Sequence, residues 1–251
     1  MSGHSKWSSI KHKKGAADAK RGQLFTKLTR ALIVAAREGG ADPAANLALQ
    51  NAIEKARAAS MPKDNIERAI ARGSGTADDA AAYEQISYEG YAPGGVAVYV
   101  DVLTDNRNRT AGDVRHIFAR HDGNLAESGS VAWLFERKGV ILVDADSADE
   151  EALTLAAADA GAEDVREEGS SYEVTCAPED LHAVRESLEA AGIGVSEAQA
   201  TMLPKTTVEI EDEATAKKVL KLIDSLEDND DVQDVYANFD IPERILEVVA
   251  A

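Results

Sequence analysis

Three stretches between residues 16 and 73 place apolar residues three and four positions apart, which is the spacing of one buried helix face. The first predicted helix runs over 16–38 and ends at Gly39-Gly40. A second helix is predicted to begin at Asp42-Pro43, because Asp caps helix N-termini and Pro suits the first helical position. A third begins at Ser60-Met61-Pro62 and ends at Gly73. Three short helices with short connections predict a small bundle.

Beyond residue 83 the pattern changes to strands. The stretches 85–91 and 95–104 are rich in β-branched and aromatic residues and are separated by the turn signal Ala92-Pro93-Gly94. Residues 110–121 return to helical spacing, and 131–135 predicts a further strand.

A weak internal repeat follows, with an offset of 31 residues. Val143 corresponds to Val174, and Asp149 corresponds to Asp180. Each copy reads strand, helix and strand, so residues 137–203 predict one α+β unit of ferredoxin-like type.

The segments on either side of this repeat each lack a partner. After Pro204 the pattern predicts a strand, a helix and a strand, and the ββαβ pattern of 84–136 has no closing half. We therefore predict an α+β protein with an N-terminal three-helix bundle and two ferredoxin-like α+β domains, one inserted in the other. The predicted boundaries are 1–75 for a basic arm and the bundle, 76–136 with 204–251 for a discontinuous domain, and 137–203 for the inserted domain.

Charge is distributed unevenly along the chain. The 251 residues carry 45 acidic and 27 basic side chains, for a net charge of −18. Residues 1–75 hold 14 Lys and Arg against 6 Asp and Glu, a balance of +8, and residues 76–251 hold 13 against 39, a balance of −26. Such separation predicts that the N-terminal region meets a polyanion.

Four cations of the first predicted helix fall within about 100° of one another on a helical wheel. This basic stripe consists of Lys20, Lys27, Arg30 and Arg37. The apolar positions around Leu28 lie opposite, and Arg21 falls toward them. A solvated helix face is the ordinary meaning of such a charge run, but residues 1–15 contain no acidic side chain and predict a mobile basic arm beside it.

The predicted nucleic-acid-binding residues combine the arm and the helix. They are Lys6, Trp7, Lys11, His12, Lys13, Lys14, Lys20, Arg21, Lys27, Arg30 and Arg37. Trp7 has two interpretations that stay open: stacking on an unpaired base, or attachment of the arm to the bundle.

The segment 103–110 concentrates polar side chains between a strand and a helix. Local turns at Asp105, Asn106 or Asn108 and a helix cap at Thr110 explain most of them. They do not explain two arginines, which are candidates for a secondary contact with a phosphate or an acidic partner. These are Arg107 and Arg109.

No enzyme is expected, because the chain lacks the G-x-S-x-G, G-x-x-x-x-G-K-[ST], G-x-G-x-x-G and H-E-x-x-H motifs. The single cysteine, Cys176, is interpreted as a buried structural thiol. His4 and His12 have Lys neighbours that disfavour a metal ion, so neither metal nor cofactor is expected. Without an apolar run of ~18–20 residues or a signal peptide, we expect a cytoplasmic protein with no membrane contact.

Five segments carry a resemblance to a known family. They are MSGHSKWSSIKHKKGAADAKRGQLFTKL, AAREGGADP, MPKDNIERAI, YEGYAPGGVAVYVDVLTDNRNRT and GNLAESGSVAWLF. Together they resemble the YebC/PmpR family, strongly over 1–136 and by architecture over the rest, with Ala126 standing where a Gly is usual. That family includes probable transcriptional regulators and the mitochondrial translational activator of cytochrome c oxidase.

The resemblance implies three domains and a non-enzymatic role in gene expression. It implies nucleic acid as the partner of this chain, most simply DNA bound by a transcriptional regulator. The alternative is a ribosome-associated translation factor that binds ribosomal RNA and relieves stalling. A monomer is the preferred oligomeric state.

Overall fold

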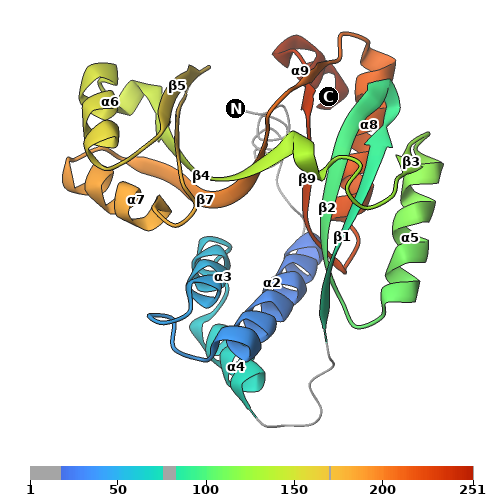
Figure 1. Ribbon diagram of the computed structural model, residues 1–251, viewed down its shortest axis with the longest axis horizontal. Coiled ribbons are helices and arrows are strands. Elements are labelled where there is room, and N and C mark those ends of the chain that lie inside the picture. The colour runs from blue at the N-terminus through green and yellow to red at the C-terminus, as the bar shows by residue number, and fades with distance from the viewer. Residues whose placement is uncertain (1–17, 76–82, 170, 251) are drawn as a thin grey trace. The chain divides into compact units, whose positions relative to one another are not determined.

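The computed structural model describes residues 18–75, 83–169 and 171–250. These residues form two compact units, one of which spans 133–207. The other unit joins the described residues up to Ala132 to those from Val208 onward. Helices and antiparallel sheets occur together, which confirms the predicted α+β class (Figure 1). The three-domain boundaries of the sequence analysis stay a prediction.

The N-terminal bundle consists of α2 (Asp18–Gly39), α3 (Leu47–Ala58) and α4 (Lys63–Ser74). Figure 1 shows α3 and α4 against the C-terminal part of α2. Leu32, Leu49 and Ala56 are fully buried there. The core residues of α2 lie between Leu28 and Ala36, so the N-terminal part of this helix is left for other contacts.

The start of α3 differs from the prediction. Asn46, and not Asp42, is the N-cap, and its Oδ1 accepts a hydrogen bond from the backbone N–H of Leu49 at 3.0 Å. The amide of Asn46 also donates to the carbonyls of Ala35 and Gly40, at 2.7 and 2.8 Å. One side chain therefore fixes the connection between α2 and α3, while Asp42 only closes a local turn.

The third predicted helix does not end at Gly73, since α4 continues to Ser74. Gly73 has a packing role instead. A Cβ at this position would lie 2.3 Å from the carbonyl oxygen of Ile33 and 2.9 Å from the Cβ of Ala36. The absent side chain therefore lets α4 approach the backbone of α2.

The sheet of the same unit has the order β3-β1-β2-β9, with antiparallel neighbours. Its strands are β1 (Glu84–Ala92), β2 (Val96–Thr104), β3 (Asn124–Leu125) and β9 (Val232–Ala237). The β1–β2 hairpin turns at η1 (Pro93–Gly95), where Gly94 and Gly95 have φ of 78° and 79°.

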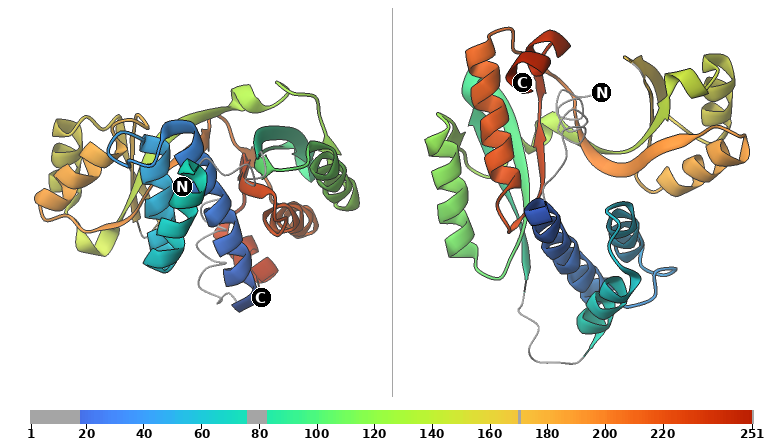
Figure 2. Two further views of the ribbon diagram at one scale, coloured as in Figure 1. Left: turned by 90° about the horizontal axis from the view of Figure 1, so that it is seen from below. Right: turned by 180° about the vertical axis from the view of Figure 1, so that it is seen from behind.

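Helices α5 (Arg107–Arg120) and α8 (Glu213–Glu227) lie side by side on one face of this sheet (Figure 2, right). Their apolar faces meet the valines of β2 in a core that includes Phe118 and Ile223. A short parallel pair, β8 (Val208–Glu209) and β10 (Phe239–Asp240), and a helix that the sequence analysis missed, α9 (Glu243–Ala250), complete the unit.

The unit of residues 133–207 contains the predicted repeat as two strand–helix–strand copies. Its elements are β4 (Phe135–Asp144), η3 (Ala145–Ser147), α6 (Glu150–Asp159), β5 (Asp164–Glu168), β6 (Ser171–Cys176), α7 (Leu181–Ala190) and β7 (Val195–Pro204). The antiparallel order β5-β6-β4-β7 is that of a ferredoxin-like sheet, with both helices packed on one face. The strand predicted at 131–135 is wrong, because Ala132–Leu134 form the 3₁₀ turn η2 before β4.

Within the described ranges, no helix has both the length and the apolar composition needed to cross a membrane.

Candidate nucleic-acid interface

The N-terminal part of α2 contacts an acidic segment of its own unit. This acidic segment, residues 227–234, begins at the last residue of α8 and holds five carboxylates, those of Glu227, Asp228, Asp230, Asp231 and Asp234. Gln23 begins the contact, since its amide donates to the carbonyl of Asp228 at 2.9 Å and to Oδ1 of Asp230 at 3.0 Å. Residues about 200 positions apart in the sequence thus meet.

Lys27 of the basic stripe is half-buried in this contact. Its Nζ donates to the carbonyl of Glu227. Burial lowers the pKa of Lys27, and the nearby charges of Glu227 and Asp230 act in the opposite direction. The ammonium group is therefore held by the chain itself in this arrangement.

Arg30, one turn further on, is held by two acceptors. Its Nη1 donates to the carbonyl of Asp230 at 2.8 Å and forms an ion pair with Oδ1 of Asp231 at 2.9 Å. The guanidinium also lies over the ring of Tyr83, 5.6 Å from its centroid. Only 19% of the Arg30 side chain is exposed, so its planar donors are mostly committed inside the unit.

Asp231 accepts hydrogen bonds from four side chains on three elements. They are Arg30 of α2, Thr104 of β2, and Arg109 and Thr110 of α5, at 2.9, 3.1, 2.8 and 2.6 Å. Its side chain is 6% exposed. Burial alone raises the pKa of Asp231, but the hydrogen bonds from Arg109, Thr110 and Thr104 outweigh burial and hold the pKa below its usual value. Asp231 is thus the ionised centre of a network that joins α2 to the sheet domain.

This network corrects the predicted roles in segment 103–110. The cap of α5 is Asn106, whose Oδ1 accepts from the backbone N–H of Arg109 at 3.1 Å. Thr110 is not the cap, because it lies inside the helix, fully buried, and donates to Asp231. Arg109 does meet acidic groups, but they belong to the same chain: Asp105 and Asp231, each at 2.8 Å. Arg107 is exposed.

The remaining predicted residues occupy different surroundings. The arm residues Lys6, Trp7, Lys11, His12, Lys13 and Lys14, and the side chain of Lys20, lie outside the part of the chain that the structure describes. Arg21 is exposed and lies over the ring of Phe25, 5.5 Å from its centroid. Arg37 is exposed in the last turn of α2. The basic stripe is therefore not one solvent-facing surface, because the acidic segment covers Lys27 and Arg30.

Exposed cations on the other two bundle helices were not among the predicted residues. Arg57 of α3 and Arg72 of α4 are exposed, as are Lys63, which pairs with Glu67, and Arg68. The charge balance of residues 1–75 includes these side chains, but they lie outside the basic stripe of the first helix. With Arg21 and Arg37 they give every helix of the bundle an exposed cation.

Glu89 is a further residue that sequence reasoning missed. Its carboxylate is buried and accepts from the backbone N–H groups of Gly129, Val131 and Ala132, at 2.7, 2.6 and 2.8 Å. Burial raises the pKa of Glu89, but these three hydrogen bonds outweigh it and hold the pKa below its usual value. Glu89 therefore fixes the loop that leads into β4, which is a structural role.

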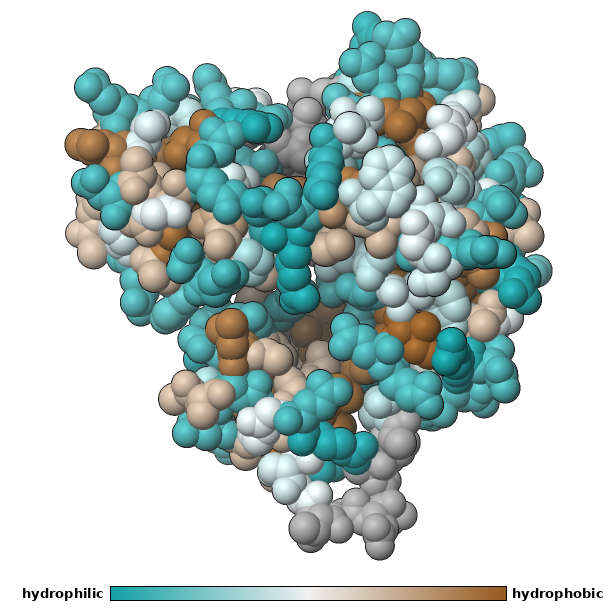
Figure 3. Space-filling view, viewed as in Figure 1, coloured by the Kyte–Doolittle hydropathy of each residue, from teal (hydrophilic) through white to brown (hydrophobic). Residues whose placement is uncertain are grey.

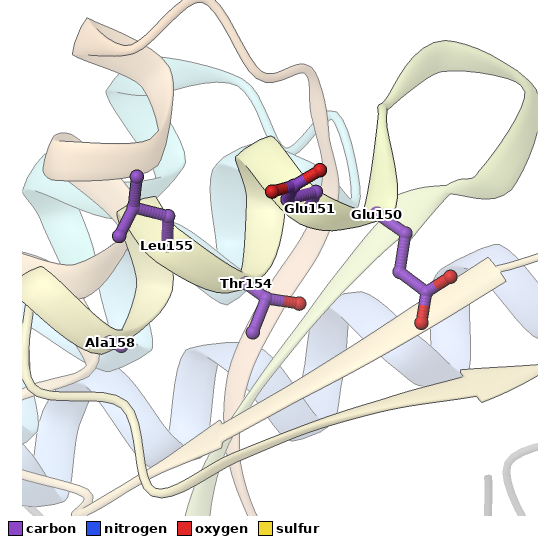
Figure 4. A pocket seen from close by; sticks show the side chains of 5 residues that line it. All are labelled: Glu150, Glu151, Thr154, Leu155 and Ala158. Carbon is purple, nitrogen blue, oxygen red and sulfur yellow. The ribbon is translucent and has the colours of Figure 1, made fainter.

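The hollow beside α6 and the apolar surface patches give little support for a binding site. The hollow beside α6 is lined by Glu150, Glu151, Thr154, Leu155 and Ala158, and in Figure 4 the side chains of Glu150 and Leu155 point away from each other. Its carboxylates disfavour an anion. On the face shown in Figure 3, hydrophilic side chains surround small, separate apolar patches.

The single cysteine of the chain is Cys176, while the two histidines considered as metal ligands, His4 and His12, lie outside the described residues. Cys176 is fully buried in the core of its unit, as predicted, and burial raises its pKa to about 11. Such a thiol is a poor nucleophile at neutral pH. Among residues 18–75, 83–169 and 171–250, no three His, Cys, Asp or Glu side chains gather in a way that could hold a metal ion.

Comparisons with known proteins agree over the whole chain. Residues 5–76 match the family described as "TACO1/YebC protein N-terminal domain", and residues 83–239 match "TACO1/YebC second and third domain". A "Probable transcriptional regulatory protein" from Rubrobacter xylanophilus is 62% identical over 250 residues and covers 100% of both chains. One of the same name from Persephonella marina is 55% identical over 251 residues, again with 100% of both chains covered.

A solved structure extends the likeness to three dimensions. The crystal structure of a conserved hypothetical protein from Aquifex aeolicus has a TM-score of 0.79 and 52% sequence identity. The match covers 90% of this chain and 93% of that one.

Proposed function

Because the chain belongs to the TACO1/YebC family, we propose that it is a cytoplasmic, non-enzymatic regulator of gene expression that binds nucleic acid. Relatives named probable transcriptional regulatory proteins support transcription as the regulated process, for which DNA is the target in this proposal. In this proposal the N-terminal region, residues 1–75, grips the phosphate backbone.

The observation that carries the proposal is the placement of charge. Residues 1–75 have a balance of +8 in a chain whose remainder has a balance of −26. Each helix of the bundle exposes cationic side chains, and the apolar side chains of the same helices form the core. Cations held in this way bind a polyanion with little loss of conformational entropy.

The contacts of Lys27 and Arg30 decide which residues carry the first encounter. Because the acidic segment holds both side chains, phosphates would first meet the arm and the exposed cations of the bundle. Such contacts fix position on a duplex without reading its sequence. A general, salt-sensitive affinity is therefore the expected mode of binding.

The acidic remainder supports a second candidate, a ribosome-associated translation factor. A charge of −26 outside the N-terminal region would repel long duplex DNA beyond a short footprint. On a ribosome the same charge would face basic proteins while the N-terminal region holds ribosomal RNA. Stronger binding to structured ribosomal RNA than to duplex DNA at equal salt would favour this candidate.

Fluorescence anisotropy of the full chain with short duplex DNA, at salt concentrations between about 50 and 200 mM, tests the proposal. We expect affinity to fall steeply with salt. The double variant Arg57→Gln/Arg72→Gln should bind about tenfold more weakly, with a salt slope smaller by about 0.9 for each lost contact. The charge-matched control Arg137→Gln/Lys205→Gln replaces exposed cations of the other unit and should bind like wild type. Absence of binding to both duplex DNA and RNA would refute the proposal.

A further inference from the structure

The acidic remainder of the chain concentrates its own basic residues on two helices. Residues 76–251 contain 13 Lys and Arg, and seven of them lie on α5 and α8. They are Arg107, Arg109, Arg115, Arg120, Lys217, Lys218 and Lys221. These two helices therefore hold more than half of the basic side chains of an otherwise acidic region.

The two helices pack against each other. They lie side by side on the same face of the sheet, as the right-hand view of Figure 2 shows. Nε2 of His121, at the C-cap of α5, is 2.9 Å from Oγ of Ser225 on α8. Asp122 pairs with Lys218 at 2.8 Å. These two contacts fix the C-terminal end of α5 against α8.

The exposed cations of this surface lie away from the buried core. Val114 and Phe118 of α5 are fully buried, whereas Arg120, at the C-terminal end of the same helix, is exposed. On α8, Lys217 and Lys221 are exposed and lie one turn apart, about 6 Å along the helix axis. The α5–α8 surface is defined here by the three exposed cations Arg120, Lys217 and Lys221.

The nearby charges leave this surface positive around His121. Arg109 and Lys218 already face carboxylates, those of Asp231 and Asp122. The helices also carry four acidic side chains, those of Asp113, Glu213, Asp224 and Glu227, against seven basic ones. Desolvation lowers the pKa of His121, and the positive charges of Arg120 and Lys221 lower it further, so these cations act together on one point.

We propose that the α5–α8 surface is a second phosphate-binding surface, which takes the sugar–phosphate backbone of nucleic acid. The proposal rests on the proposed function, because it concerns the same class of ligand. Cations preorganised on two packed helices neutralise phosphates at low entropic cost, and no apolar or base-reading groups are needed for this. The surface would add contacts that the N-terminal region alone does not supply.

The test compares full-length variants by anisotropy with short duplex DNA at about 100 mM salt. Arg120→Gln/Lys221→Gln should bind roughly tenfold more weakly than wild type, with a salt slope lower by about two. Lys217→Gln/Lys221→Gln is a second variant of the same surface, for which we expect a loss of similar size. The three side chains are exposed, so the thermal unfolding of both variants should match wild type.

The controls separate this inference from the proposed function. Arg137→Gln/Lys205→Gln removes the same charge from the other unit and should leave affinity unchanged. If wild type binds and Arg57→Gln/Arg72→Gln is weakened while both α5–α8 variants bind like wild type, only this inference is overturned. A loss in the control equal to that in the α5–α8 variants would also overturn it, because net charge would then explain the effect. If wild type binds no nucleic acid, both proposals fail.

Discussion

Replacing Asp231 by Asn should destabilise the unit that contains the bundle. The carboxylate of Asp231 is 6% exposed and accepts from four side chains. Asn keeps the shape but loses the charge and one acceptor oxygen, and it turns an N–H₂ group toward cationic donors. The fully buried hydroxyls of Thr104 and Thr110 lose most by this change, since no water reaches them.

The magnitude follows from the exposure of the partners. Breaking a fully buried ion pair costs about 3–5 kcal/mol. The side chain of Arg109 is 46% exposed and that of Arg30 is 19% exposed, so water recovers part of this loss. We therefore expect the free energy of unfolding to fall by about 3 kcal/mol. The exposed pair of Lys55 and Asp234, at 3.4 Å, should contribute less than about 1 kcal/mol.

Urea unfolding followed by far-ultraviolet circular dichroism measures this change, with Asp234→Asn as the control. The pKa of Asp231 is lowered in the folded state, so its stabilisation is present above the unfolded pKa of about 3.9 and is lost as pH falls through the folded value. The difference between wild type and Asp231→Asn should accordingly stay constant from about pH 7 to pH 5 and shrink as the pH falls below about 4. A loss at neutral pH no larger than that of Asp234→Asn would refute the reasoning.

Three further outcomes are expected. Gly73→Ala should destabilise the bundle by about 1–3 kcal/mol in urea unfolding, because the added Cβ would lie 2.3 Å from a backbone oxygen. In the same assay Gly22→Ala, which has open space around it, should stabilise α2 by about 0.5–1 kcal/mol. Asp228→Asn/Asp230→Asn should strengthen duplex DNA binding roughly three- to tenfold in anisotropy, since two charges that repel phosphates near α2 are removed. Deleting 137–203 and closing the gap with a short linker should leave cooperative thermal unfolding in calorimetry; its loss would contradict an inserted domain.

Local periodicity was sufficient to predict the bundle and the repeat. Helical spacing identifies which residues share a face, and a face that packs, such as that of Leu32, makes the prediction strong. The prediction from the repeat is confirmed because each copy forms a strand–helix–strand unit with its own buried core positions. Turn chemistry was less decisive: Asp42 and Asn46 are both good caps, and contacts of Asn46 with Ala35 and Gly40 select it.

A helical wheel shows which residues share a face of a helix, but not which part of the protein that face contacts. Lys27 and Arg30 share a side of α2 as predicted, but their neighbours come from residues 227–231, some 200 positions away in the sequence. The same holds for Thr110 and Arg109, whose roles depend on Asp231. Long-range pairing of this kind leaves no local signal, although the run of acids after α8 is visible in the sequence.

The single cysteine gives the protein a natural chemical reporter. Cys176 lies at the centre of the unit of residues 133–207, and its thiol is both inaccessible and protonated at neutral pH. Alkylating reagents can therefore reach it only when that unit opens, and the other unit has no thiol to add background. The rate of labelling measures the opening of one unit within the intact chain, without any engineered probe.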